Sequence, residues 1–323
     1  MNYLCHATKV MGIFQCEEPV TLQTQQAFME HMNKFGLSYG TTDEFNFRLG
    51  VFAKADKEIK EINAKETSFK LGHNQYSTYT KEEMKKMAGF KAPDEGLQTN
   101  VKVLDTSDLP HDIDWVAQGV VAEIKNQGQC GSCWSFSATN CMESHHAIKT
   151  GELLDLSEQQ YVDCVKNAYG CNGGWMGYAF DYSMTSPQDL EKDYKYKARQ
   201  NYRCLDRRYK GKVSVQNYWN VPRESVDQLK AAITYGPVSV TLQSASRVFQ
   251  NYESGILDSD DCGTDVDHAV NAVGYGVEDG KEYYLIRNSW GTWWGDEGYI
   301  KIAITPGVGT CGIQQWSLYP QTD

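Results

Sequence analysis

A glycine-rich loop that runs into a helix constrains this chain more than any other short stretch. Residues 127–134 read QGQCGSCW, and the residues that follow favour a helix that ends at Gly151. Cys133 then stands in the first helical turn, where free N–H groups and the helix dipole favour thiolate over thiol. Because a thiolate is a nucleophile, the pattern indicates a site for covalent chemistry.

A nucleophilic cysteine needs a proton partner, and two later motifs supply candidates. His268 lies in a VDHAV motif and Asn288 in an RNSWG motif, 135 and 155 residues after Cys133. Two other interpretations stay open at this point. Cys130 and Cys133 also have the spacing of a zinc or redox pair, and a lone histidine on a strand is more often part of the core. Neither a zinc site nor a redox site requires Gln127, His268 or the Asn-Ser-Trp sequence.

In order and spacing, these motifs resemble those of papain-like cysteine proteases, in the form of a cathepsin L-like precursor. The resemblance extends from about residue 21 to the C-terminus. It implies an α+β fold with a helical left lobe, a β-barrel-like right lobe and an active-site cleft between them. It also implies these roles: Cys133 as nucleophile, His268 as acid and base, Asn288 to orient His268, Gln127 with the Cys133 N–H as oxyanion hole, and Trp290 to shield the imidazole–amide hydrogen bond.

The same resemblance implies a substrate-binding surface in the cleft. Gly173 and Gly174 would lie against the peptide backbone, since only glycine permits so close an approach. Trp316 stands where small or acidic residues are usual, so we expect a shallow apolar S2 pocket that prefers Leu or Val to Arg and disfavours Phe. Ordinary core packing is the alternative for the predicted binding residues, which are Trp175, Met176, Thr241, Val266, Asp267, Ala269 and Trp316. No cofactor and no metal are expected.

The cysteines indicate an oxidising compartment. Of ten cysteines, six beside the nucleophile surround the predicted site, which is many for a reducing cytosol. The sequence alone leaves 15 pairings of six cysteines. The family resemblance selects Cys130–Cys171, Cys164–Cys204 and Cys262–Cys311. Cys133 then stays free for chemistry, Cys141 is expected to be a buried inert thiol, and Cys5 and Cys16 have no assigned role.

The N-terminal third indicates a helical propeptide. Its apolar side chains recur at helical spacing, which alone predicts only an amphipathic helix. The positions also match the interspersed motif of cathepsin L-like propeptides, with Ala55 in place of one Asn. A second motif follows at residues 72–78, GHNQYST, where Tyr76 and Thr78 depart from the family's Phe and Asp. The propeptide motif residues are Glu44, Arg48, Phe52, Ile59, Asn63, Gly72, Asn74 and Tyr76.

By resemblance, the propeptide is an intramolecular inhibitor that runs through the cleft in the reverse direction to a substrate. Residues 86–90 would lie nearest Cys133, and the mature enzyme would begin near residues 106–110. The loss of an Asp at Thr78 removes any pH trigger that depends on a carboxylate there. We therefore divide the chain into an N-terminal segment (1–20), an inhibitory propeptide (21–106) and a papain-like peptidase domain (107–323).

Composition excludes several other function classes. The 323 residues carry a net charge of −11, of which −10 falls on residues 107–323, and no basic stripe suggests nucleic-acid binding. No apolar run approaches the roughly 20 residues needed to span a bilayer. In residues 1–20, His6 and Lys9 interrupt the apolar stretch of a signal peptide, and a remnant of a targeting sequence is one interpretation.

The leading hypothesis is a cysteine endopeptidase zymogen of a lysosome or other acidic digestive vacuole, or a secreted one. The expected partners are protein or peptide substrates, its own propeptide and cystatin-type inhibitors, and we expect a monomer. An exopeptidase would carry a cleft-blocking insertion, and none is evident between Cys204 and His268. The alternative from another class is a non-catalytic papain-fold binding or inhibitor protein, which commonly loses the nucleophile.

Overall fold

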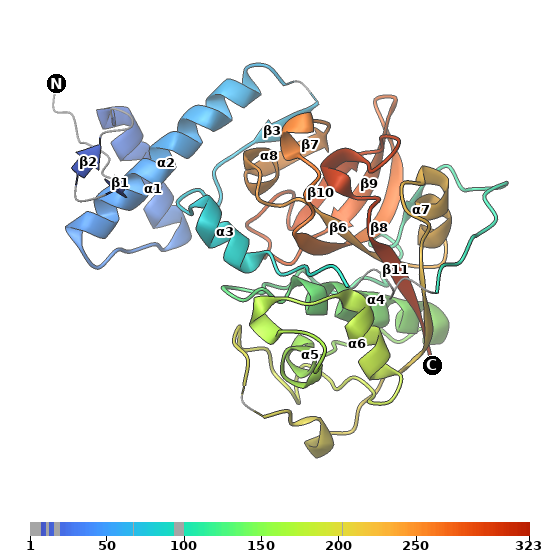
Figure 1. Ribbon diagram of the computed structural model, residues 1–323. Helices are drawn as coiled ribbons and strands as arrows, with labels where there is room; N and C mark the ends of the chain where they lie inside the picture. The colour runs from blue at the N-terminus through green and yellow to red at the C-terminus, as the bar shows by residue number, and fades with distance from the viewer. Residues whose placement is uncertain (1–7, 11–12, 16–19, 67, 94–99, 202) are drawn as a thin grey trace.

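The computed structural model describes residues 8–10, 13–15, 20–66, 68–93, 100–201 and 203–323. A helical N-terminal region projects from one side of a larger body, in which a sheet lies above a group of helices (Figure 1). The α+β prediction is therefore confirmed. Cys5, Cys16 and residues 94–99 of the connector lie outside the described residues.

The N-terminal region is built on two helices. A short hairpin of β1 (Thr8–Val10) and β2 (Ile13–Gln15) precedes α1 (Leu22–Phe35) and α2 (Thr42–Asn63). Threonine hydroxyls cap both helices, and α1 ends at Gly36 with φ 61°, which glycine adopts without strain. Phe28, Leu49 and Phe52 are buried where the two helices pack together. This small core gives the propeptide a fold of its own.

The propeptide then joins the larger body through one strand and one helix. Strand β3 (Phe69–Leu71) pairs antiparallel with β7 (Tyr252–Leu257), so the propeptide extends the catalytic sheet. Helix α3 (Lys81–Met87) begins with a capping box formed by Thr80 and Glu83, as its sequence predicts. It lies beside the place where the sheet and the helices below it meet (Figure 1).

The helical lobe centres on α4 (Cys133–Thr150), which is buried on all sides from its first residue to Ala147. Helices α5 (Glu158–Cys164) and α6 (Met176–Ser183) pack below it, and the sheet covers it from above (Figure 1). Helices α7 (Val226–Ile233) and α8 (Arg247–Gln250) belong to the sheet side. Short 3-10 turns complete the lobes at Gly170–Asn172, Asp206–Arg208, Asp260–Cys262 and Thr310–Gly312.

The sheet has the order β3-β7-β10-β9-β8-β6-β11-β5, with β4 (Ile113–Asp114) added on β8. Its remaining strands are β5 (Val215–Asn220), β6 (Val238–Leu242), β8 (His268–Glu278), β9 (Lys281–Arg287), β10 (Tyr299–Ala303) and β11 (Ser317–Thr322). Strand β8 is buried from His268 to Gly276, because α4 packs against its face. It therefore presents its first residue to the start of α4.

Disulfide bonds join Cys130 to Cys171, Cys164 to Cys204 and Cys262 to Cys311, the pairing expected from the family. In the described part of the chain, none of the helices combines the length and apolarity that a bilayer crossing requires.

Candidate active site

Cys133 is the first residue of α4, and its side chain is fully buried. The disulfide between Cys130 and Cys171 fixes the loop just before it. Two backbone N–H groups donate to its Sγ, from Gly89 of the propeptide at 3.2 Å and from Ala269 of β8 at 3.4 Å. The propeptide therefore touches the predicted nucleophile directly.

His268 opens β8 and lies on the opposite wall of the cleft. Its Nε2 is 2.8 Å from Oδ1 of Asn288. The Ser289 N–H also donates to that oxygen, so it is an acceptor and Nε2 carries the proton. Nδ1 is then the unprotonated nitrogen, and among the described residues it has no hydrogen-bond partner. The Trp290 ring covers the imidazole, with centroids 5.0 Å apart.

Both predicted catalytic groups are uncharged in this covered state. Burial raises the pKa of the Cys133 thiol to about 12. Burial also lowers the pKa of His268 to about 4, although the hydrogen bond that it donates to Asn288 opposes this. Both shifts have one cause, the loss of water around the charged form. The thiolate and imidazolium predicted from the sequence therefore require that the cover leaves.

The Gln127 side chain is fixed beside the nucleophile and is already in use. Its Nε2 donates to the Met87 carbonyl of the propeptide and to the Cys130 carbonyl, each at 2.8 Å. Its Oε1 accepts from the Ser289 hydroxyl at 2.7 Å, which fixes the amide orientation. A propeptide carbonyl thus occupies the donor that the family resemblance assigns to the oxyanion hole.

The propeptide backbone runs along the substrate glycines. Gly174 donates to the Gly89 carbonyl at 2.8 Å, and its own carbonyl accepts from Lys91 at 2.9 Å. Phe90 forms a parallel bridge with Gly174, and its N–H donates to the Asp267 carbonyl at 2.9 Å. These contacts use the same backbone groups that were predicted to hold a peptide.

Close approach explains the glycines on both sides of this contact. A Cβ on Gly89 would lie 2.0 Å from the Gly131 carbonyl oxygen, and one on Gly173 would lie 2.7 Å from the Gly89 carbonyl oxygen. Gly173 also has φ 113°, which side chains rarely adopt. The residues predicted nearest Cys133, 86–90, are the ones found there.

The Phe90 side chain occupies the predicted S2 region. It belongs to one apolar cluster with Trp175, Met176 and Ala269, and its ring lies 6.1 Å from that of Trp316. Val266 packs at the edge of this cluster, and Thr241 is fully buried on β6 opposite Ala269. Trp175 is buried among Tyr178 and Tyr218, as a core residue would be. A propeptide phenylalanine thus lies in the predicted S2 region, and the expectation that a substrate Phe is disfavoured there stays a prediction.

The first propeptide motif forms a charged brace between its helices. Arg48 donates to Glu44 at 2.7 Å and makes a two-armed contact with Glu83 of the capping box, each arm 2.6 Å long. It also donates to the Thr78 carbonyl at 2.8 Å. The pKa of Glu83 is lowered by Arg48 despite the opposing effect of burial. Glu83 thus supplies a carboxylate to Arg48 where Thr78 cannot.

The other motif residues fix the propeptide to itself and to the sheet. Asn63 clamps the Leu71 backbone with two hydrogen bonds of 2.8 Å, and Asn74 donates to the Gln250 carbonyl. The Tyr76 hydroxyl donates to the Trp290 carbonyl at 3.2 Å. A Cβ on Gly72 would meet Glu253 at 2.5 Å. Ile59 and Ala55 are both buried. Ala55, which stands in place of the motif's Asn, is therefore part of the core.

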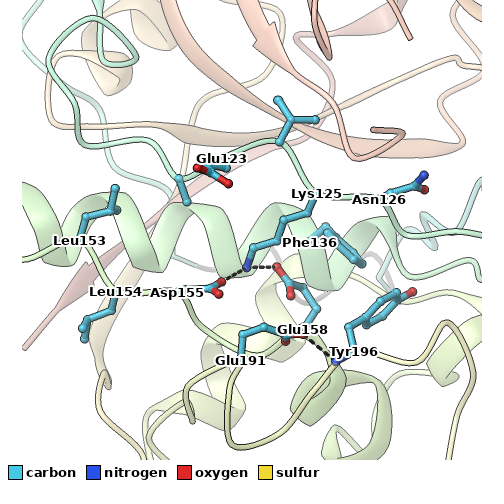
Figure 2. A pocket seen from close by; sticks show the side chains of 12 residues that line it. Glu123, Lys125, Asn126, Phe136, Leu153, Leu154, Asp155, Glu158, Glu191 and Tyr196 are labelled. Carbon is cyan, nitrogen blue, oxygen red and sulfur yellow. Dashed lines mark hydrogen bonds and ion pairs between the residues drawn. The ribbon is translucent and has the colours of Figure 1, made fainter. Parts of the chain in front are cut away.

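A buried cation braces the loop that leads to Gln127. Lys125 Nζ lies 3.0 Å from Glu143, 2.7 Å from Asp155 and 2.9 Å from Glu158. Figure 2 shows Lys125, Asp155 and Glu158 at the wall of a cavity of about 520 Å³, which Glu191 and Tyr196 also line. Burial alone would lower the pKa of Lys125, but the surrounding carboxylates raise it. Burial raises the pKa of Glu158 to about 7, against the attraction of Lys125.

Several contributors escaped the sequence analysis. Tyr196 donates to the Gln127 carbonyl and contacts the Ser132 hydroxyl, and Arg223 lies 3.6 Å above the Trp316 ring. His145 also has a partner that no local pattern indicates. It is buried, and its Nε2 lies 3.0 Å from the Pro237 carbonyl.

Comparison with known proteins agrees with this geometry. Residues 109–321 match the family model for papain family cysteine proteases, and residues 28–84 match the cathepsin propeptide inhibitor domain. The chain is 41% identical to the probable cysteine protease RD21B of Arabidopsis thaliana, over 90% of this chain and 64% of that protein. It therefore spans less than two thirds of RD21B. It is 39% identical to chymopapain of Carica papaya, over 91% of this chain and 86% of chymopapain.

Among solved structures, digestive procathepsin L2 proteinase from the larval midgut of Tenebrio molitor superposes with a TM-score of 0.85 at 34% identity. The match covers 92% of this chain and 99% of that one. Both the catalytic body and the inhibitory propeptide are thus accounted for. The chain belongs to the papain family of cysteine proteases and is a zymogen that carries its propeptide inhibitor domain.

Proposed function

We propose that this zymogen is a cysteine endopeptidase whose catalytic groups are Cys133, His268, Asn288 and Gln127. The single observation that supports this most is the arrangement of the propeptide. Its backbone forms hydrogen bonds with the Cys133 sulfur, the Gln127 side-chain amide and the Gly174 backbone at the same time. An inhibitor that occupies these three places marks where a substrate peptide would bind.

In the proposed mechanism, the Cys133 thiolate attacks a peptide carbonyl and forms a carbon–sulfur bond. The oxyanion accepts hydrogen bonds from Gln127 and the Cys133 N–H. As the carbon–nitrogen bond breaks, the His268 imidazolium gives its proton to the leaving amine, which leaves a thioester. Water then attacks the thioester while His268 takes a proton, and the thiolate departs. Asn288 holds the imidazole in place, and Trp290 shields that hydrogen bond.

The propeptide maintains latency because it runs antiparallel to the proposed substrate direction. We propose that removal of residues up to about 106–110 opens the cleft, in an acidic digestive vacuole, a lysosome or outside the cell. The exposed segment at residues 105–112 favours cleavage there, since proteases act on accessible loops. Protein substrates, cystatin-type inhibitors and a monomeric state complete the proposal.

For the S2 pocket we propose a preference for apolar P2 residues. The Arg223 guanidinium on Trp316 places positive charge beside the pocket, so Arg at P2 should be a poor substrate. Peptides that differ only at P2 test this, and efficient turnover with Arg would overturn it.

The catalytic assignment is tested with acid-processed enzyme and an internally quenched peptide with Leu at P2. Cys133→Ser should abolish hydrolysis, whereas Cys141→Ser, on the same helix, should retain it. An epoxide thiol reagent should bind once per molecule and stop turnover. A non-catalytic binding protein would instead show no hydrolysis in the unaltered processed chain.

A further inference from the structure

Besides the cleft segment, a second stretch of the propeptide is held on the catalytic body. Residues 100–104, here called the strap, lie along β5, which is the last strand in the sheet order. Val101 forms a parallel bridge with Asn220 at the end of β5. The strap continues toward α7, on the far side of the body from the propeptide helices (Figure 1). None of its contacts involves the predicted catalytic residues.

The strap adds to the sheet through its backbone. The Asn220 N–H donates to the Asn100 carbonyl at 2.8 Å, and the Asn220 carbonyl accepts from Lys102 at 3.1 Å. The Asn100 side chain also donates to the Tyr218 carbonyl. Lys102 Nζ lies 4.4 Å above the Trp219 ring. The outer edge of β5 is thus paired as long as the strap is present.

One side chain anchors the strap, and one amide clamps it. Leu104 is 7% exposed and belongs to the same apolar cluster as Val221 and Leu229, whereas Val103 is 76% exposed. Gln228 of α7 accepts from the Leu104 N–H at 2.8 Å and donates to the Leu104 carbonyl at 2.9 Å. A single leucine thus enters the body while its backbone is satisfied on both sides.

Removal of the propeptide leaves this surface open. The β5 edge then presents unpaired N–H and C=O groups, which readily pair with another extended chain. The Gln228 amide loses both partners, and the leucine pocket is vacated. A groove with this chemistry fits an extended peptide that carries an apolar side chain of leucine size.

We infer that the strap groove, formed by the β5 edge, Gln228 and the Leu104 pocket, is a second peptide-binding site of the processed enzyme, which takes an extended segment of a protein substrate. This inference rests on the proposed endopeptidase function. The chain limits how far the groove lies from the cleft, since nine residue steps lead from Lys91 on Gly174 to Asn100 on β5, a span of at most about 32 Å. A substrate runs opposite to the propeptide, so the groove would take residues on the N-terminal side of the cleaved bond.

Chain direction does not prevent this use of the groove. An edge strand pairs with either a parallel or an antiparallel neighbour. The Gln228 amide offers one donor and one acceptor, so it can satisfy the backbone of a residue that runs in either direction. The leucine pocket then selects among substrates.

The test uses processed enzyme and two quenched peptides with identical residues around the cleaved bond. The long peptide carries fourteen further residues on its N-terminal side, because Leu104 lies fourteen residues after Phe90 in the propeptide. Its N-terminal end carries the residues NVKVL in reversed order, LVKVN. The ratio of kcat/KM for the long over the short peptide should be roughly fivefold to tenfold, because binding at a tethered second site adds to the first. Gln228→Ala, or Asp in place of the leucine in the peptide, should return the ratio to about one.

Gln216→Ala is the matched control, since this exposed glutamine lies on β5 and does not contact the strap. A ratio near one in the unaltered enzyme, or a raised ratio that survives both changes, would overturn the inference. So would a processed enzyme that retains the strap by intact mass, because its own chain would fill the groove. Failure to cleave the short peptide would instead overturn the proposed function itself. If Gln228→Ala does not fold, the altered peptide still gives the answer.

Discussion

The two free cysteines of α4 are eight residues apart and equally buried, yet different parts of the molecule bury them. Over Cys133 lie the Gly89 N–H of the propeptide and the Ala269 N–H of β8. Cys141 contacts the Ser239 hydroxyl and the Asn271 amide of the sheet and the carbonyl of Pro237, the residue before β6. Burial raises the pKa of both thiols to about 12. The covered state therefore hides a difference that only the removal of the propeptide can reveal.

This comparison shows how one helix can hold an inert thiol and a latent nucleophile. Position in the first turn gives Cys133 the helix dipole, and its sulfur accepts from the N–H of Ala269, the residue after His268; the contacts of Cys141 include neither feature. Those features lower the pKa of the thiol only once the propeptide has left and water can surround the charged forms. The propeptide segment that covers Cys133 thus keeps the enzyme latent, whereas the residues around Cys133 supply the chemistry.

The largest expected effect is the divergence of the two thiols on processing. Removal of the propeptide should raise the alkylation rate of Cys133 by roughly a thousandfold or more, because the pKa of a cysteine paired with a protonated histidine falls to about 4. The rate at Cys141 should stay unchanged. Mass spectrometry of peptides after timed iodoacetamide labelling measures both in one sample. Equal acceleration of the two thiols would contradict the comparison.

The next effect concerns the stability of the lobe that holds Cys141, whose helix α4 also carries Glu143. Lys125→Met should cost about 3–5 kcal/mol of unfolding free energy, since it leaves buried carboxylates of Glu143 and Glu158 without their cation. Urea unfolding of the Cys133→Ser chain, which cannot digest itself, measures this. Cys141 labelling through global opening should rise in parallel.

Lys281→Met is the control for the buried cation. Its partner Asp258 is half-exposed, as is Lys281 itself, and such surface pairs contribute less than about 1 kcal/mol. A similar loss in both variants would show that the Lys125 group is no more important than a surface pair.

A third prediction removes only the cover. Gly89→Ala should raise Cys133 labelling in the intact chain by roughly thirtyfold, because the added Cβ meets the backbone of Gly131 and costs about 2 kcal/mol of docking. Cys141 labelling should not change. Gly40→Ala, where a Cβ meets nothing within 4 Å, is the control. Unaltered labelling in Gly89→Ala would mean that the propeptide does not hold the thiol through this contact.

The sequence allowed the prediction of what local motifs encode. The Cys133 loop, the position of His268 before an apolar strand, and the capping box at Thr80 all depend on neighbours in the chain. The cover could be located only to residues 86–90. The Gly89 contact depends on the exact path of two backbones, and nothing in the sequence around Gly89 shows how close Gly131 lies.

Other features depend on long-range packing and left no local signal. Lys125 stands in an ordinary loop, and its three carboxylates come from two helices and a turn. The sequence of residues 100–104 is typical of a polar connector, although their backbone pairs with β5. His145 gained a partner from a segment 92 residues away. Such pairings follow from the tertiary fold rather than from periodicity.

The smallest predicted effect is the acid sensitivity of the cover. His31 and His73 are packed against Phe52, with the two imidazole centroids 5.8 Å apart, and Asp56, Lys60, Arg247 and Lys34 surround them. Burial lowers the pKa of His31 to about 4 and lowers that of His73. Both are thus neutral in the folded propeptide. The stabilising contribution of neutral His31 is complete above pH 6.5, the value in the unfolded chain, and is lost as the pH falls toward 4; that of His73 is lost in the same direction.

For His31 alone this loss is about 2 kcal/mol at pH 5, by linkage between protonation and folding. Amide hydrogen exchange in α1 and α2 of the Cys133→Ser chain, corrected for intrinsic rates, should therefore show less protection at pH 5 than at pH 7. His31→Phe keeps an aromatic ring against Phe35 and Phe52 but removes the titrating group, so its protection should change less with pH. The same pH profile in both chains would place the acid response elsewhere in the propeptide. A flatter pH profile in His31→Phe would link the release of Cys133 to a histidine in the propeptide core rather than to a group in the cleft. The Gly89 contact that covers Cys133 would not by itself predict this link.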